Sequence, residues 1–164
     1  MDLTILIPTR IETEDRLRNI ISSVSYLLKH VPAKIIVKEV SDQNAFKFRA
    51  LPEIKKYADT SNLTCLFEET QEPLFCKSKV LNDLIVAADT NVVANYDADC
   101  ILPVDAYHQA YNAIQDNQLD VVYPYQCGIY QWKAEYSMDI YNSFIQNLST
   151  DVLDKSKILS NSTI

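Results

Sequence analysis

Two aspartates separated by one residue, Asp97 and Asp99, are the side chains of this sequence best suited to hold a metal ion. They follow the apolar run Val92–Tyr96 and precede Pro103, which can open a helix. In a strand, residues i and i+2 share a face, so both carboxylates can reach one cation if the chain stays extended. Mg²⁺ and Mn²⁺ accept such ligands beside phosphate oxygens and waters. The alternative interpretation is that these acids only cap the helix expected from about Val104.

Composition excludes several classes of function. The chain has 164 residues and a net charge of −7 with scattered basic residues, so we expect no surface for nucleic acid. A single glycine, Gly128, excludes Gly-rich phosphate loops, so phosphate recognition would need a metal and side chains. The four cysteines form no Cys-x-x-Cys pair, and we expect them to be reduced, mostly buried thiols.

The length and the N-terminal sequence bound the type of protein. At this length we expect one domain with a real core. The sequence shows neither a leader segment nor an apolar run of membrane-spanning length. We therefore expect a cytoplasmic protein without a transmembrane segment, with peripheral attachment to the inner face of a membrane as the alternative.

Hydrophobic periodicity predicts alternating strands and helices. The expected strands are Leu3–Pro8, Lys34–Val40, Leu63–Glu68, Asn91–Tyr96 and Asp120–Pro124. The expected helices are Thr13–His30, a segment capped by Ser41–Asn44 that runs to about Tyr57, Ser78–Ala88, Val104–Gln118 and Tyr136–Leu148. This order predicts the α/β class, with a doubly wound, mainly parallel sheet and helices on both faces.

Ligands of such sheets bind beyond the carboxyl ends of the strands, where the strand order reverses. If the first and fourth strands are neighbours there, acids, bases and hydroxyls gather on one rim. The residues expected on this rim are Thr9, Arg10, Glu39, Ser41, Lys77, Lys79, Asp97 and Asp99. A simpler alternative remains open for some of them. Arg10 and the two lysines can be solvated surface charges without a ligand, and Glu39 can simply be the residue at which a strand ends.

Four blocks of the sequence, in this order, resemble the N-terminal, nucleotide-sugar-binding part of family-two glycosyltransferases of the GT-A fold. They are Ile5–Arg10, Ile35–Asp42, Cys76–Asn82 and Asn95–Asp99. They are similar, respectively, to the family's opening strand ending in Pro-Thr, its second-strand block, a basic segment running into Leu-Asn, and its Asp-x-Asp metal motif. The match covers roughly Leu3–Pro124.

The resemblance implies a role for each of these residues. It implies nucleoside contacts by Thr9, Glu39 and Arg10, with Ser41 on the same edge, base or phosphate contacts by Lys77 or Lys79, a ribose or metal contact by Asp97, and metal and diphosphate contacts by Asp99. It further implies a Mn²⁺ or Mg²⁺ cofactor. The donor would be a nucleoside-diphosphate sugar, a UDP-sugar in preference to a GDP-sugar, and the acceptor a glycan or other hydroxyl compound.

The implied reaction is glycosyl transfer with inversion, in which a general base deprotonates the acceptor and the cation stabilises the departing diphosphate. We place the nucleotide-sugar-binding domain at residues 1–124. Residues 125–164 would begin an acceptor-side region or form a C-terminal extension that is partly disordered. The spacing of Asp120, Glu135 and Asp139 nominates none of them as the base, so we expect a piece or natural fragment of a longer protein.

Two residues depart from the family pattern. Val40 stands where the family usually has Gly, and Lys38 stands where an acid is common, so the base-binding corner is expected to differ. A second hypothesis, motivated by the unidentified base and the weak pattern of the C-terminal residues, is a non-catalytic module that kept the fold, lost the acceptor half and acts in a complex or as a homodimer. A nucleotidyltransferase is disfavoured, because such enzymes generally carry a Gly-rich N-terminal loop.

Overall fold

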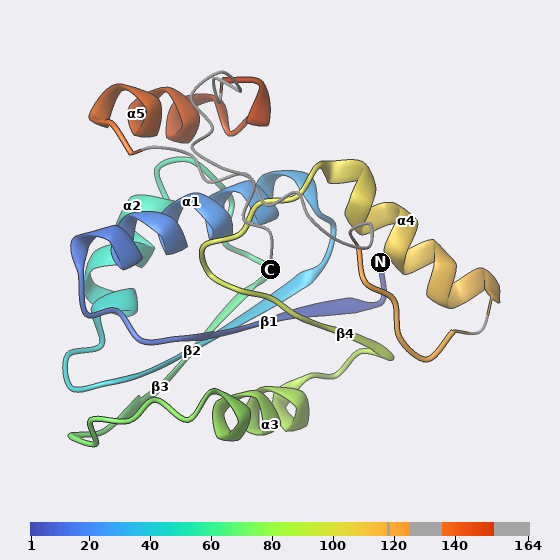
Figure 1. Cartoon of the computed structure of the whole chain (residues 1–164), viewed down its shortest axis with the longest axis horizontal. Coiled ribbons are helices and arrows are strands. Elements are labelled where there is room, and N and C mark those ends of the chain that lie inside the picture. Colours follow the sequence, from blue (N-terminus) through green and yellow to red (C-terminus); the bar gives the residue numbers. More distant parts are fainter. Residues whose placement is uncertain (118, 125–135, 153–164) are drawn as a thin grey trace, which may run out of the picture. The chain divides into compact units, whose positions relative to one another are not determined.

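The first strand lies inside a four-stranded parallel sheet, which suits a strand that is apolar on both faces (Figure 1). The computed structural model describes residues 1–117, 119–124 and 136–152. The strands are β1 (Leu3–Thr9), β2 (Lys34–Ser41), β3 (Leu63–Glu69) and β4 (Val92–Asn95), in the order β3-β2-β1-β4. The expected adjacency of the first and fourth strands is thus confirmed, and all pairings are parallel.

Helices cover both faces of this sheet, which confirms the predicted α/β class. Helix α1 (Glu14–His30) and α2 (Leu51–Ile54) lie on one face, and α3 (Lys77–Ala87) lies on the other (Figure 1). Helix α1 begins where the hydroxyl of Thr13 accepts a hydrogen bond from Arg16 N, and its apolar residues, Ile20, Val24 and Leu27 among them, are buried. The periodicity of the sequence therefore placed this helix correctly.

The segment after β2 is helical, but less regular than the sequence predicts. A π-helical turn, η1 (Phe46–Ala50), runs directly into α2, which carries Pro52 in its first turn. Asn44 has a φ of 49°, a left-handed conformation that asparagine tolerates better than most residues.

The expectation of mostly buried cysteines is wrong for Cys65 and Cys76, which are exposed free thiols.

The chain divides into two compact units, residues 1–101 and 102–164. The second unit contains α4 (Val104–Asn117), α5 (Met138–Asn147) and the short 3-10 helix η2 (Thr150–Val152). The functional division predicted at residue 124 stays a prediction, and most of the expected partly disordered segment lies outside the described residues. None of the helices in the described part of the chain combines the length and apolar character that a membrane crossing requires.

The predicted fifth strand, Asp120–Pro124, is wrong. These residues have no regular secondary structure, and the side chains of Val121 and Tyr123 are 68% and 71% exposed. A strand is defined by the hydrogen bonds it shares with a neighbour, and within the described residues this segment pairs with no other strand. An apolar run alone therefore did not make a strand here.

A buried lysine helps to hold α3 against the sheet. Lys38, on β2, donates to Glu68 Oε2 at 2.7 Å and to Asp83 Oδ2 at 2.6 Å, and Lys79 donates to Glu68 Oε1 at 2.9 Å. Burial alone would lower the pKa of Lys38, but the hydrogen bonds to Asp83 and Glu68 outweigh it and raise that pKa. The hydrogen bonds from Lys38 and Lys79 lower the pKa of Glu68 to about 2.

This ion network predicts a stability that is sensitive to acid. Because the folded pKa of Glu68 lies below its ordinary 4.5, ionised Glu68 stabilises the fold above about pH 4.5, and this contribution is lost as the pH falls through about 2. Urea unfolding at decreasing pH should show a smaller acid-induced loss of stability in Glu68→Gln than in the wild type. Glu53→Gln, which removes a local pair with Lys56, is the matched control. Equal pH slopes in Glu68→Gln and the wild type would contradict the prediction.

Candidate functional site

The segments that follow β1, β2 and β3 enclose a groove of about 450 Å³ at the carboxyl edge of the sheet. Residues 10–14 after β1, residues 41–43 at the end of β2, and Thr70 and Gln71 after β3 line it, together with Ala45 and Arg49. Most of this lining is polar, and it lies where ligands of open α/β sheets bind. Of the residues predicted from the sequence, Arg10 and Ser41 line the groove.

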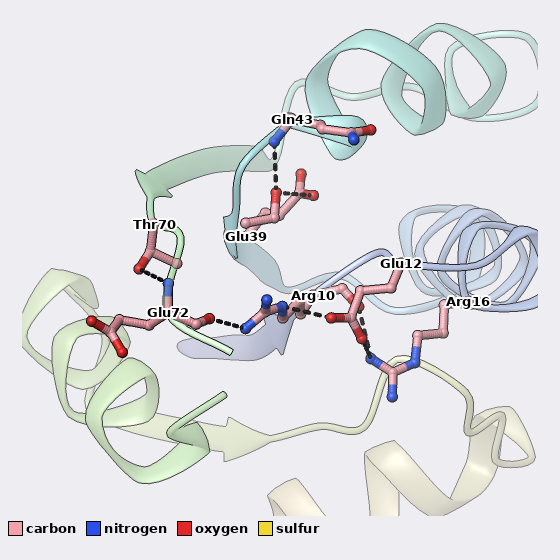
Figure 2. Close-up of polar contacts among 8 residues, drawn as sticks. Arg10, Glu12, Arg16, Glu39, Gln43, Thr70 and Glu72 are labelled. Atoms are coloured by element: carbon pink, nitrogen blue, oxygen red, sulfur yellow. Dashed lines mark hydrogen bonds and ion pairs between the residues drawn. The ribbon is translucent and has the colours of Figure 1, made fainter. Parts of the chain in front are cut away.

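Arg10 crosses from the end of β1 to the loop after β3 (Figure 2). Its Nη1 donates to the backbone oxygen of Glu72 at 2.8 Å, and its Nε lies 2.9 Å from Glu12 Oε1 in an ion pair without hydrogen-bond alignment. Arg16 Nη1 in turn lies 3.1 Å from both Glu12 Oε2 and the Arg10 backbone oxygen. The Arg10 side chain is only 13% exposed, yet a guanidinium has more N–H donors than these contacts use. Arg10 therefore ties two walls of the groove together and keeps capacity for an anion.

Glu39 lies behind the groove rather than in it. Its side chain is completely buried, and its carboxylate accepts three hydrogen bonds: from Ser41 Oγ at 2.8 Å, Ala45 N at 3.1 Å and Phe46 N at 2.6 Å. The last two donors stand at the start of the helical segment, where backbone N–H groups lack partners within the helix. Glu39 therefore acts as a remote cap that positions the loop between β2 and η1, and the nucleoside contact expected of it stays a prediction.

The hydroxyl of Ser41 continues this arrangement. It donates to Glu39 and accepts from Gln43 N at 3.3 Å, which bends the loop so that Gln43 lines the groove (Figure 2). Thr9 is paired in register with Glu39 and is 7% exposed, outside the groove lining. Thr9 and Glu39 thus support the groove from within the sheet.

Asp97 and Asp99 follow β4 in a β-turn, not in an extended strand. Cys100 N donates to Asp97 O at 3.2 Å, so Ala98 and Asp99 are the central residues of the turn. Both carboxylates are exposed at this edge. The residue before α4 is Pro103, so neither aspartate occupies the N-cap position of that helix. The condition that the chain stays extended between the acids is not met, and the turn exposes them instead.

The charge around this turn is mixed. Lys77, the first residue of α3, forms an ion pair with Asp97. Burial, followed by the negative charges of Asp99 and Asp97, raises the pKa of the Cys100 thiol, although Lys77 opposes this effect. The thiol is therefore neutral near pH 7.

The donor set suits a cation that shares its shell with phosphate. No group of three or more His, Cys, Asp or Glu side chains poised for a metal occurs within residues 1–117, 119–124 and 136–152. Asp97 and Asp99 are the two carboxylates that the turn provides. Two such oxygens would suit Mg²⁺ or Mn²⁺, because these ions commonly take one or two protein oxygens and complete their shell with phosphates and waters.

The predicted residues thus fall into separate groups. Arg10 and Ser41 meet at the groove, Lys77 meets Asp97 at the turn, and Lys79 lies away from both, paired with Glu68 on the α3 face. Ten of the twelve lining residues were not predicted from the sequence, and eight of these are polar: Glu12, Thr13, Glu14, Asp42, Gln43, Arg49, Thr70 and Gln71. All of the polar ones except Arg49 come within five residues after the end of β1, β2 or β3, and this position is the signal that could have found them.

Comparison with known proteins gives one sequence relative and a related fold. No protein-family model matches the chain. Over 157 residues, 96% of the chain, it is 26% identical to a Sulfolobus acidocaldarius protein named "Probable glycosyltransferase". The chain spans about a third of that relative's length, 32%.

The fold has a counterpart among solved structures. The crystal structure of S. aureus TarS residues 1–349 superposes with a TM-score of 0.52 and 16% sequence identity, covering 72% of this chain and 33% of that one. At this identity the similarity concerns the fold alone, and it agrees with the α/β architecture described above.

The buried position of Glu39 predicts a large effect of an isosteric change. In Glu39→Gln, an amide NH₂ would face N–H groups that now donate to an oxygen, which should cost about 1–3 kcal/mol of folding free energy. Urea unfolding measures this cost. Glu69→Gln, at the exposed end of β3, is the matched control and should change stability by less than about 0.5 kcal/mol. A wild-type stability for Glu39→Gln would show that the carboxylate does not cap this loop.

Proposed function

We propose that this chain supplies the donor-binding half of a metal-dependent, inverting glycosyltransferase. The observation that carries the proposal is the placement of the Asp97–Cys100 turn after β4, beside β1, at the edge that also forms the polar groove. Similarity to a relative named "Probable glycosyltransferase" supports the same class. The donor would be a nucleoside-diphosphate sugar, with UDP as the first nucleotide to test.

In this proposal each part of the edge has one task. The groove between the loops after β1, β2 and β3 takes the nucleoside, with Ser41 and Gln43 on one wall and Arg10 across it. Asp97 and Asp99 would hold Mn²⁺ or Mg²⁺, which when bound would neutralise the diphosphate leaving group. Lys77 adds a positive charge at the same place.

The acceptor side is left without assigned residues. Of the acids considered as a base, Asp120 and Asp139 belong to the second unit, and Glu135 lies outside the described residues. The general base and the residues that bind the glycan or other hydroxyl acceptor would accordingly belong to the remaining polypeptide of a longer enzyme, in keeping with the fraction of the relative that this chain spans.

A non-catalytic nucleotide-sugar-binding or protein-interaction module is the second proposal. It is favoured by the internal engagement of the edge, since Glu39, Arg10 and Asp97 already have partners within the chain. Sugar transfer by the 164-residue chain alone would exclude this alternative.

Calorimetric titration with UDP, with and without Mn²⁺, tests the first proposal. Mn²⁺ should strengthen UDP binding, and Asp99→Ala should weaken the metal-dependent binding by at least about tenfold, because it removes one of two carboxylates. Asp116→Ala, at an exposed position of α4, is the matched control and should bind as the wild type does. UDP binding that is indifferent to Mn²⁺ and to Asp99 would overturn the proposal.

A further inference from the structure

Lys77 is the ion-pair partner of Asp97, one of the two carboxylates proposed to bind the metal. Its ammonium is ion-paired with Asp97, and the side chains of Lys77 and Asp97 are 43% and 57% exposed. The second carboxylate differs, because Asp99 is exposed and faces the thiol of Cys100, whose Sγ lies 3.8 Å from Asp99 Oδ1. In the free chain, a cation would therefore find Asp99 accessible and Asp97 already neutralised.

The backbone on the Lys77 side of this pair is held in place. Lys77 begins α3, which packs Val80 and Leu84 into a core cluster with Leu6 and is tied to β2 through Asp83 and Lys38. Helix α3 thus fixes where the Lys77 side chain starts, while the exposed side chain itself can turn to another partner.

The backbone on the Asp97 side is held equally well. Tyr96 N donates to Leu6 O at 3.0 Å, which continues the β1–β4 ladder, and Ser23 Oγ of α1 donates to Ala98 O at 2.8 Å. The hydroxyl of Tyr96 donates to Cys100 O at 2.6 Å across the turn. The ion pair is thus built into the fold, and only the Lys77 side chain has to move for Asp97 to gain another partner.

We infer that Lys77 is an internal counter-ion that makes metal and nucleoside diphosphate bind cooperatively. This inference rests on the proposed function. A divalent cation alone must displace the ammonium from Asp97, which weakens its binding. When a diphosphate arrives with the metal, the ammonium transfers from Asp97 to the phosphate oxygens, so the displaced charge keeps a partner. Metal and nucleotide each then improve the binding of the other by the same factor.

Substitution Lys77→Met keeps the length of the side chain and removes the competing charge. Because an exposed ion pair contributes little free energy, Mn²⁺ alone should bind Lys77→Met about two- to fivefold more tightly than the wild type. The factor by which UDP strengthens Mn²⁺ binding should fall in the variant, because the ammonium that changes partner is gone. Electron paramagnetic resonance of free Mn²⁺, with and without UDP, measures both quantities without any assay of activity.

Lys34→Met is the matched control, because Lys34 forms an exposed pair with Asp89 at the other end of the strands, with side chains 54% and 69% exposed. It removes the same charge and the same type of pair, and should bind Mn²⁺ as the wild type does. Lys77→Gln serves as a second variant, and thermal unfolding checks that both Lys77 variants fold.

The outcomes separate the two claims. The inference is overturned if Lys77→Met and Lys77→Gln leave Mn²⁺ affinity unchanged or weaker, if Lys34→Met tightens it equally, if the UDP coupling factor is unchanged, or if neither wild type nor variant binds Mn²⁺. The proposed function survives the first three of these results as long as UDP binding to the wild type still depends on Mn²⁺ and on Asp99. It fails with the inference when that dependence is also missing.

Discussion

β1 is hydrogen-bonded to a parallel strand on each side, and all seven of its residues are buried. A strand in that position favours apolar side chains on both faces, and the first charged residue after β1, Arg10, comes only where the chain leaves the sheet. Arg10 and Thr70 come directly after β1 and β3, and Asp97 is the second residue after β4. Because the strands are parallel, the polar residues that follow them lie at the same edge of the sheet, and the candidate site is at that edge.

The alternation of side chains along β2 separates two kinds of polar chemistry. Lys38 and Val40 face α3, where Lys38 bonds Glu68 and Asp83 and Val40 packs with Val80 and Leu84. Glu39 and Ser41 face the other way, toward the loop that lines the groove. The two residues that depart from the family-two pattern are therefore on the sheet face opposite the groove. The residues that alternate with them, Glu39 and Ser41, make the hydrogen bonds that hold the loop lining the groove.

The sequence predicted the regular elements of the first unit well, because apolar periodicity and burial agree there. Its predictions failed where distant residues decide. Asp120–Pro124 has the apolar pattern of a strand, but pattern carries no information about whether a neighbour is available. The sequence did not reveal that Glu39 accepts hydrogen bonds from donors six and seven residues later, because this contact depends on how the loop folds back, and the nucleoside contact expected of Glu39 stays a prediction. The pairing of Lys77 with Asp97 likewise joins residues brought together only by the sheet.

The network around Lys38 also bears on how relatives of this chain would be recognised by sequence. A buried ammonium is stable only beside its acids, so positions 38, 68 and 83 are expected to vary together during evolution: a basic residue at 38 with acids at 68 and 83, or none of the three. Such a triplet, spread over two strands and a helix, is invisible to a search for a short contiguous motif.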